Sequence, residues 1–154
     1  MGRLVIKTEL RAPIERCFDL ARDVEVHCRT AAFTSERAVP PGRTSGLLEL
    51  GDTVTFEGRH FGLRLRLTAR IVEMQRPVRF VDEAIGGPFE RLRHVHEFHS
   101  RDDATEMIDM LEWEAPYGVL GRIADWLILD RHLGWFVRTK QGALKGLAEE
   151  DGAV

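Results

Sequence analysis

The sequence predicts an α+β fold, in which a curved antiparallel sheet of about six or seven strands wraps around one long C-terminal helix. Residues 52–115 alternate apolar and polar side chains with period two and are divided by short turns, which is typical of an antiparallel meander. From Gly118 the apolar residues recur at helical spacing, up to an acidic tail. The sheet has one apolar face and the helix one apolar stripe, so packing the helix into the concave sheet buries both.

The N-terminal part predicts one strand followed by two short helices. Residues 3–10 (RLVIKTEL) alternate weakly and are expected to form the first strand. Residues 13–22 place apolar side chains at helical spacing after a proline, which predicts an amphipathic helix. Asp23 is expected to cap a second short helix that extends to about Ala31. These two helices would close one end of the groove between the sheet and the terminal helix.

The central part predicts the meander of strands. Residues 40–46 (PPGRTSG) are turn-forming and precede it. In LRLRLTARI at 63–71 leucine and arginine alternate, so one face of the sheet is expected to be dry and the other wet. The predicted strands are 52–61, 63–74, 78–85, 89–99 and 105–115.

The terminal helix is expected to begin at Gly118 and to bend near Asp130 or Gly134. Its arginine, lysine and aspartate side chains are predicted to lie on the side away from the sheet. We expect residues 1–154 to form a single domain, with a flexible tail from about residue 148.

Composition narrows the class of protein. Hydrophobic residues make up 44% of the chain and charged residues 31%, and the formal net charge is −3, so we expect a folded protein that does not bind nucleic acid. The sequence shows neither an apolar run long enough for a membrane span nor a signal peptide, and a cytoplasmic location is the default expectation. Cys17 and Cys28 form no metal-type pair and are interpreted as reduced thiols, with Cys17 packed in the core.

Residues 91–100 (RLRHVHEFHS) hold three histidines, and strand alternation predicts where they point. A hairpin turn at residues 86–88 would pair Phe80 with His94 and Asp82 with Leu92, which places these four side chains on one face.

The face of residues 90–98 that points inward can be chosen by comparing the side chains that each choice would bury. Leu92, His94, His96 and Phe98 share one side of their strand, and the other side would bury two arginines and a glutamate. We therefore expect His94 and His96 to point inward and His99 outward. On the next strand the predicted inward residues are Met107, Asp109, Leu111 and Trp113.

Three interpretations of the inward histidines stay open. They are hydrogen-bonded core residues, or polar contacts in a ligand cavity, or metal ligands together with a nearby aspartate. The metal interpretation is the least favoured, since an HxH pair alone is a weak signal and no HExxH motif or cysteine partner supports it. His27 and His132 are expected to be surface or helix-packing residues. His60 shares parity with Val54 and Phe56 and is a candidate inward residue.

The element order and four phrases resemble the SRPBCC superfamily, which includes the START proteins and the birch pollen allergen, and within it small bacterial cyclase/dehydrase-like or ligand-binding members. The resemblance covers about residues 3–147. The phrases are APIERCFDLARD at 12–23, RHFGLRLRLTARI at 59–71, RFVDEAIGGPFERLRHVHEF at 79–98 and APYGVLGRIADWLILDR at 115–131.

The resemblance implies a helix-grip fold with a deep cavity between the sheet and the terminal helix. Members of the superfamily bind lipids, sterols, polyketides, plant hormones or quinones, and some cyclise or dehydrate polyketides. The positions that match the inward pattern of the group are His60, Phe80, Asp82, His94, His96, Phe98 and Asp109.

We therefore expect binding of a small hydrophobic molecule, of lipid, polyketide or aromatic type, with no cofactor and no resident metal. The alternatives are a cyclase or dehydratase that uses His96 and Asp109 as an acid/base pair, and a protein-interaction module that receives a partner's helix. The sequence leaves open whether the protein is a monomer or a homodimer. The predicted ligand-binding residues are Phe56, His60, Leu65, Leu67, Phe80, Asp82, Leu92, His94, His96, Phe98, Asp109, Leu111 and Trp113.

Overall fold

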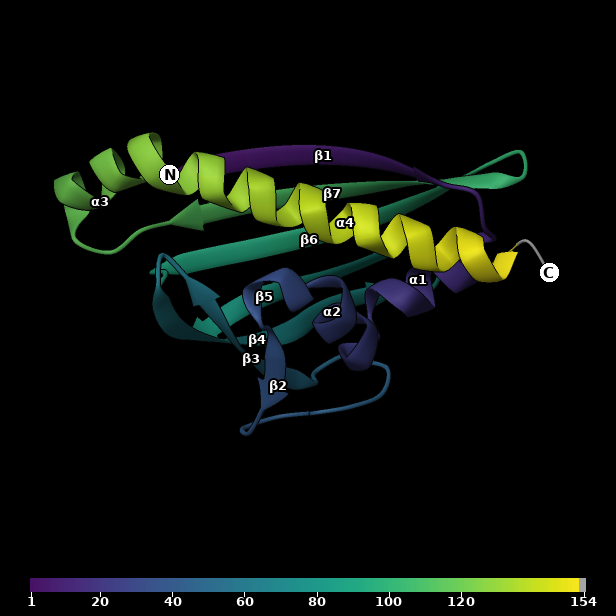
Figure 1. Ribbon diagram of the computed structural model, residues 1–154, viewed down its shortest axis with the longest axis horizontal. Coiled ribbons are helices and arrows are strands. Elements are labelled where there is room, and N and C mark those ends of the chain that lie inside the picture. Colours follow the sequence, from purple (N-terminus) through teal and green to yellow (C-terminus); the bar gives the residue numbers. More distant parts are fainter. Residues whose placement is uncertain (153–154) are drawn as a thin grey trace.

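A curved seven-stranded antiparallel sheet holds a long C-terminal helix against its concave face in the computed structural model (Figure 1). The structure describes residues 1–152, and the side chains of all of these except 125, 126, 151 and 152. The order of strands across the sheet is β1-β7-β6-β5-β4-β3-β2. The strands are β1 (Gly2–Leu10), β2 (Arg37–Val39), β3 (Thr53–His60), β4 (Leu63–Gln75), β5 (Arg79–Gly86), β6 (Arg91–Arg101) and β7 (Ala104–Glu114).

The helices occupy the predicted places. They are α1 (Ile14–Ala21), α2 (Val24–Thr30), the short 3-10 turn η1 (Ala32–Thr34), α3 (Gly118–Ala124), the π-helical turn η2 (Asp125–Leu129) and α4 (Asp130–Gly152). Asp23 caps α2 as predicted, because its carboxylate accepts hydrogen bonds from the backbone N–H groups of Glu25 and Val26.

The predicted α+β helix-grip architecture is confirmed, and β2 is an addition to it. This three-residue strand pairs with residues 55–57 of β3 at the sheet edge. It is too short to show a period-two pattern, which is why the sequence did not predict it.

The hairpin register between β5 and β6 differs from the prediction by two residues. Phe80 pairs with His96 and Asp82 with His94, because residues 87–90 form a longer loop than the tight turn expected at 86–88. A shift by two residues leaves every side chain on its predicted face, since the side-chain period of a strand is two.

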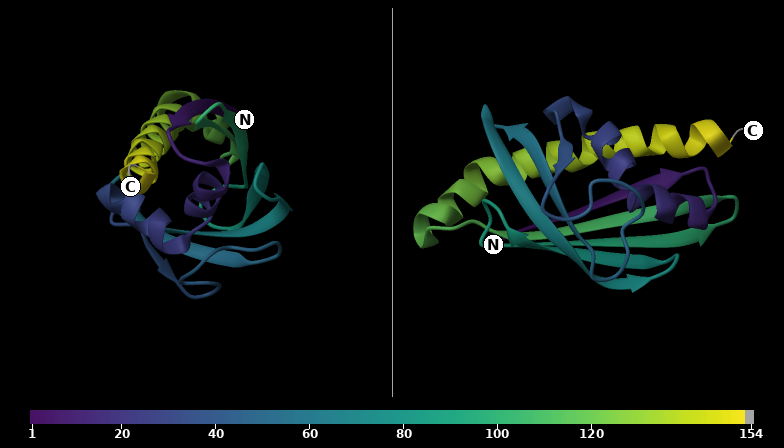
Figure 2. Two further views of the ribbon diagram at one scale, coloured as in Figure 1. Left: turned by 90° about the vertical axis from the view of Figure 1, so that its right-hand side faces the viewer. Right: turned by 90° about the horizontal axis from the view of Figure 1, so that it is seen from below.

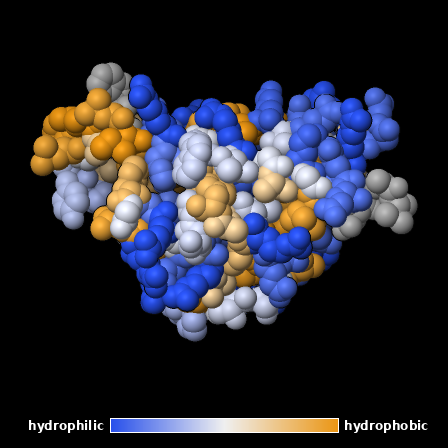
Figure 3. Space-filling model, viewed as in Figure 1, coloured by the Kyte–Doolittle hydropathy of each residue, from blue (hydrophilic) through white to orange (hydrophobic). Residues whose placement is uncertain are grey.

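The terminal helix changes direction where α3 meets α4, close to the predicted bend at Asp130 (Figure 2). The π-helical turn η2 separates the two α-helical parts, and such turns interrupt the regular hydrogen-bond ladder. Figure 1 shows α3 reaching beyond the end of the sheet, and Figure 3 shows apolar side chains gathered there. The exposed apolar side chains of this region include Tyr117, Val119, Leu120 and Ile123.

The helix α4 continues through Gly152, and Ala148 on it is buried. Flexibility from about residue 148 stays a prediction, and residues 153–154 lie outside the described part of the chain. None of the helices described in residues 1–152 has the length and apolar character needed to cross a bilayer.

Two apolar clusters fill the space between the sheet and the helices. The larger lies under α1 and α2 and contains Phe18, Phe80, Phe98, Met107 and Leu144. The smaller contains Ile6, Leu111, Trp113 and Val137. Cys17 is buried in the larger cluster as predicted, and both cysteines are free thiols.

Candidate functional site

A layer of polar side chains separates the two apolar clusters. Along β6 the inward residues run from Leu92 through His94 and His96 to Phe98, and only the first and last belong to the apolar clusters. Along β7 Asp109 lies between Leu111 and Met107 in the same way. On α4, Lys140 and Gln141 lie between Val137 and Leu144. We call the six residues Asp82, His94, His96, Asp109, Lys140 and Gln141 the polar layer.

Hydrogen bonds link the histidines to two aspartates from neighbouring strands. The Nε2–H of His94 donates to Oδ1 of Asp109 over 2.9 Å, and the Nε2–H of His96 donates to Oδ2 of Asp82 over 2.9 Å. The Nδ1 of His96 lies 3.0 Å from the same Oδ1 of Asp109. The two imidazole rings are stacked with centroids 3.8 Å apart. One buried carboxylate oxygen therefore contacts both rings.

The pKa values in this layer move in opposite directions. Burial lowers the pKa of His96, but its contacts with Asp109 and Asp82 outweigh burial and raise the pKa overall. Burial and the neighbouring His96 lower the pKa of His94, and these outweigh its bond to Asp109. Burial raises the pKa of both aspartates, but the histidine contacts hold each pKa below its ordinary value. The layer thus places side by side two imidazoles whose pKa values are shifted in opposite directions.

Solvent still reaches part of the polar layer. The side chain of Asp82 is 25% exposed and that of His94 is 17% exposed, although both point toward the concave side of the sheet. In contrast, Asp109 is only 1% exposed and lies at the bottom of the layer. The accessible members can contact a molecule that enters between the sheet and α4.

The remaining predicted site residues divide into two groups. Phe80, Phe98, Leu111 and Trp113 are buried in the apolar clusters, and Phe80 also stacks on His96 at 4.2 Å between centroids. The partly accessible group consists of Phe56, His60, Leu65, Leu67 and Leu92. The outward position of His99 is confirmed by its 52% exposed side chain.

A hollow of about 80 Å³ opens on the sheet where β6 begins and β7 ends, and most of its lining residues, such as Glu83, Arg93 and Glu112, belong to the outward face. Leu92 and Trp113 contribute to its wall. Sites for drug-sized ligands typically enclose about 300–1,000 Å³. No described residue of α3 or α4 lines this hollow, so it is not the cavity between the sheet and the terminal helix that the resemblance implies.

A second polar cluster, which the sequence did not predict, lies on the β3 side of the groove. Glu36 has one carboxylate oxygen 3.6 Å from Nε2 of His27 and the other 3.6 Å from Nε2 of His60. His60 Nδ1 shares a 2.8 Å hydrogen bond with His132 Nε2 on α4. Burial raises the pKa of Glu36, but the two histidines outweigh it and bring the pKa to about 2.

Lys140 corrects the prediction that the charged residues of the terminal helix face away from the sheet. Lys140 is only 8% exposed, and burial lowers the pKa of its ammonium group. Among the described side chains, no carboxylate lies within ion-pair distance of it. A signal was present in the sequence, because Val137, Lys140, Gln141 and Leu144 follow the helical spacing of the buried stripe.

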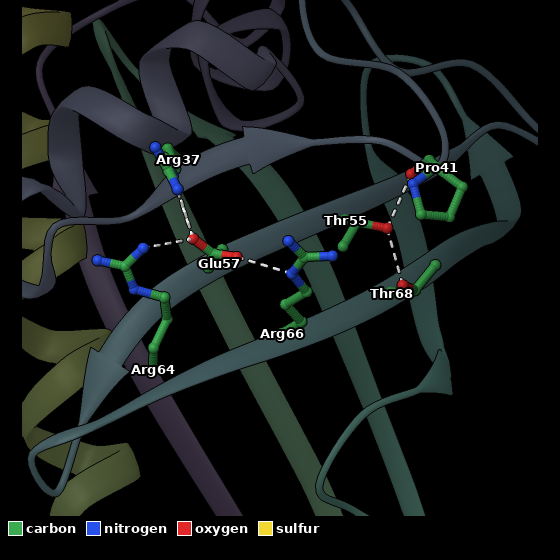
Figure 4. A network of polar contacts seen from close by, with 7 residues as sticks. All are labelled: Arg37, Pro41, Thr55, Glu57, Arg64, Arg66 and Thr68. Carbon is green, nitrogen blue, oxygen red and sulfur yellow. Dashed lines mark hydrogen bonds and ion pairs between the residues drawn. The ribbon is translucent and has the colours of Figure 1, made fainter.

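The convex face of the sheet carries a separate network (Figure 4). Arg37, Arg64 and Arg66 converge on Glu57, with the shortest N–O distances at 2.7 Å, and cover it so that the residue is only 4% exposed. The predicted wet face of LRLRLTARI is thus a charged surface, and it lies apart from the polar layer.

Comparisons with solved structures agree on the architecture. The protein TTHA0849 from Thermus thermophilus superposes with a TM-score of 0.78 at 16% identity, over 97% of this chain and 99% of that one. A START superfamily protein from Mycobacterium smegmatis gives 0.72 at 12% identity, over 96% and 97% of the two chains. The chain has the START superfamily fold.

The START fold is also that of the ZhuI aromatase/cyclase from a Streptomyces species, with a TM-score of 0.77 at 13% identity over 96% of this chain and 93% of that one. No protein-family profile matches the sequence, and no curated protein matches it. At identities this low, the structural superpositions establish the fold alone. The function therefore has to be argued from the polar layer itself.

Proposed function

We propose that the protein binds a small, largely apolar molecule with a polar oxygen group, between the sheet and α4. The observation that carries this proposal is a solvent-accessible polar group between two apolar clusters, formed by Asp82 and His94. Ligand sites commonly combine apolar walls with a few convergent polar groups.

The proposed contacts follow from the exposure of each side chain. Leu65, Leu67 and Leu92 are partly accessible on the inward face and would contact the apolar part of the ligand. Asp82 and His94 would receive its hydroxyl or carbonyl group, because a polar group that leaves water needs a hydrogen-bond partner. This fits ligands of lipid, polyketide or aromatic type that carry an oxygen.

Binding can be tested with 2-naphthol and naphthalene, an aromatic pair that differs in one hydroxyl. We expect the protein to bind 2-naphthol more tightly in isothermal titration calorimetry, and Asp82→Leu to remove that preference. Leu92→Arg should weaken both ligands about tenfold or more, whereas Leu50→Arg on an exposed loop should change neither. Equal binding of both compounds by the unmodified protein would contradict the role of the polar layer.

A second candidate function is supported by the opposite pKa shifts of the adjacent imidazoles. Neighbouring titratable groups with pKa values pushed apart are the usual arrangement of a general acid and a general base. A cyclase or dehydratase would use His96 as the proton donor, with Asp109 holding its ring. His96→Ala should then abolish turnover of a poly-ketone substrate while ligand affinity stays within about tenfold. Unchanged turnover in that variant would exclude this role.

A further inference from the structure

Three members of the polar layer form a set of metal-ligating atoms. Asp82, His94 and His96 each offer one such atom, and the three atoms lie within 4.8 Å of one another. Asp82 on β5 pairs directly with His94 on β6, and His96 follows two residues later on the same face. Two imidazoles and one carboxylate form a ligand set that first-row divalent metals accept.

Asp109 supplies the supporting contact that histidine ligands of metals usually have. Such histidines donate one ring N–H to a carboxylate, which fixes the tautomer and leaves the other ring nitrogen free to bind. Asp109 Oδ1 lies 2.9 Å from His94 Nε2 and 3.0 Å from His96 Nδ1. With both protons held there, His94 Nδ1 carries a lone pair, and His96 Nε2 would carry one once the proton that it donates to Asp82 has left.

A bound cation would take the place of the proton that now lies between His96 Nε2 and Asp82 Oδ2, which are 2.9 Å apart. Asp82 and Asp109 offer two carboxylates in a buried region, and these would offset the charge of a divalent ion in part, since Lys140 lies in the same layer. The Asp109 Oδ2 and the Gln141 Oε1 are buried without a hydrogen-bond partner among the described atoms, so the layer is not fully satisfied by its own contacts.

The site also has the access that a metal with an open coordination position needs. Asp82 and His94 are partly exposed to solvent, whereas Asp109 behind them is not. Three protein ligands leave at least one position of a tetrahedral ion for water or a ligand oxygen. The sequence ranked a metal last because HxH alone is weak, and the structure adds Asp82 as third ligand and Asp109 as the orienting carboxylate.

We propose that Asp82, His94 and His96 bind a divalent transition-metal ion such as Zn²⁺, with Asp109 positioning both imidazoles. This site does not depend on the proposed binding of an apolar molecule, and it would add a Lewis acid at the bottom of the same groove.

The test uses the full chain, stripped of metal with a chelator and titrated with ZnCl₂ by calorimetry and with CoCl₂ by visible absorption. We expect one equivalent of Zn²⁺ to bind, and Co²⁺ to give the intense bands of a four-coordinate ion. Asp82→Asn and His94→Phe should each weaken Zn²⁺ binding by about 100-fold or more, and Asp109→Asn by about 10–100-fold. Circular dichroism of each variant establishes that it is folded.

Two controls make the result specific to this site. His99→Ala removes the outward histidine of the same strand and should leave Zn²⁺ affinity unchanged. His60→Gln tests the neighbouring cluster around Glu36 and should also leave it unchanged. Absence of saturable Zn²⁺ binding, or binding that survives in Asp82→Asn and His94→Phe, would overturn the proposal, as would loss of binding in His60→Gln alone.

The two proposals fail separately. The 2-naphthol titration is repeated on the metal-free protein, so binding of 2-naphthol without Zn²⁺ uptake refutes the metal site alone. Uptake of Zn²⁺ that depends on Asp82 and His94, without any binding of 2-naphthol, supports the metal site and refutes the proposed function.

Discussion

Lowering the pH should destabilise the fold through His27, whose imidazole is held neutral inside the protein. Its ring stacks on Phe56 with centroids 3.7 Å apart, and its Nε2 is buried without a hydrogen-bond partner among the described atoms. Burial, and to a lesser degree the charge of Lys140, lowers its pKa from 6.5 to about 4 despite Glu36 at 3.6 Å.

The sign and size of the effect follow from linkage. Because the pKa of His27 is lower in the folded than in the unfolded chain, the unfolded chain binds more protons between pH 6.5 and 4. The contribution of neutral His27 to the free energy of unfolding is therefore fully present above pH 6.5 and is lost as the pH falls toward 4. The shift from 6.5 to about 4 corresponds to about 3 kcal/mol, at about 1.36 kcal/mol per pKa unit.

Urea unfolding followed by tryptophan fluorescence between pH 7 and 4 measures this contribution in the unmodified protein and in His27→Phe. The variant keeps the ring stacked on Phe56 but cannot take up a proton. We expect its free energy of unfolding to fall by about 3 kcal/mol less than that of the unmodified protein over this range. His99→Phe, at an exposed position, is the control and should follow the unmodified protein. Parallel pH profiles for His27→Phe and the unmodified protein would refute the reasoning.

Three other substitutions have defined expected outcomes. Trp113 is 1% exposed, so Trp113→Ala leaves a cavity in the core. We expect this variant to lower the free energy of unfolding, measured in urea titrations, by about 3–5 kcal/mol. A loss under about 1 kcal/mol would show that the surrounding side chains collapse into the cavity. Asp23→Ala removes the cap of α2 and should cost about 1 kcal/mol, with Asp23→Asn as the near-neutral control; equal losses in both would argue against capping. Gly58→Ala places a Cβ against the carboxylate of Glu36 and should displace it, so the pKa of Glu36 should rise from about 2 in NMR titrations. A pKa that stays at about 2 in that variant would mean that the pair of histidines moves with the carboxylate.

The inward direction of the histidines was predictable because alternation along a strand does not depend on register. The predicted pairing of Phe80 with His94 was wrong by two residues, yet His94, His96 and Asp109 all face the concave side as expected. The loop at 87–90 sets the register, and its length is a matter of loop conformation that period-two patterns do not encode.

The burial of Lys140 could not be predicted from charge patterning. A lysine is assigned to solvent by default, since burying its ammonium group is costly. Here Asp82 and Asp109, which are distant in sequence, favour the charged form of Lys140, although burial outweighs them and lowers its pKa. The cluster around Glu36 was also missed, because His27, His60 and His132 come from three separate elements that are distant in sequence and share no local pattern.

The pairing of the first strand with the last strand has a consequence for how the chain folds as it is synthesised. Strand β1 pairs along its whole length with β7, from Gly2 opposite Trp113 to Leu10 opposite Thr105. Ribosomes release the N-terminus first, so β1 waits without its partner until more than two thirds of the chain has emerged. Contacts this distant in sequence also slow closure of the sheet. A nascent chain stalled before residue 104 should therefore expose β1 to proteases and chaperones, and one released past residue 114 should protect it.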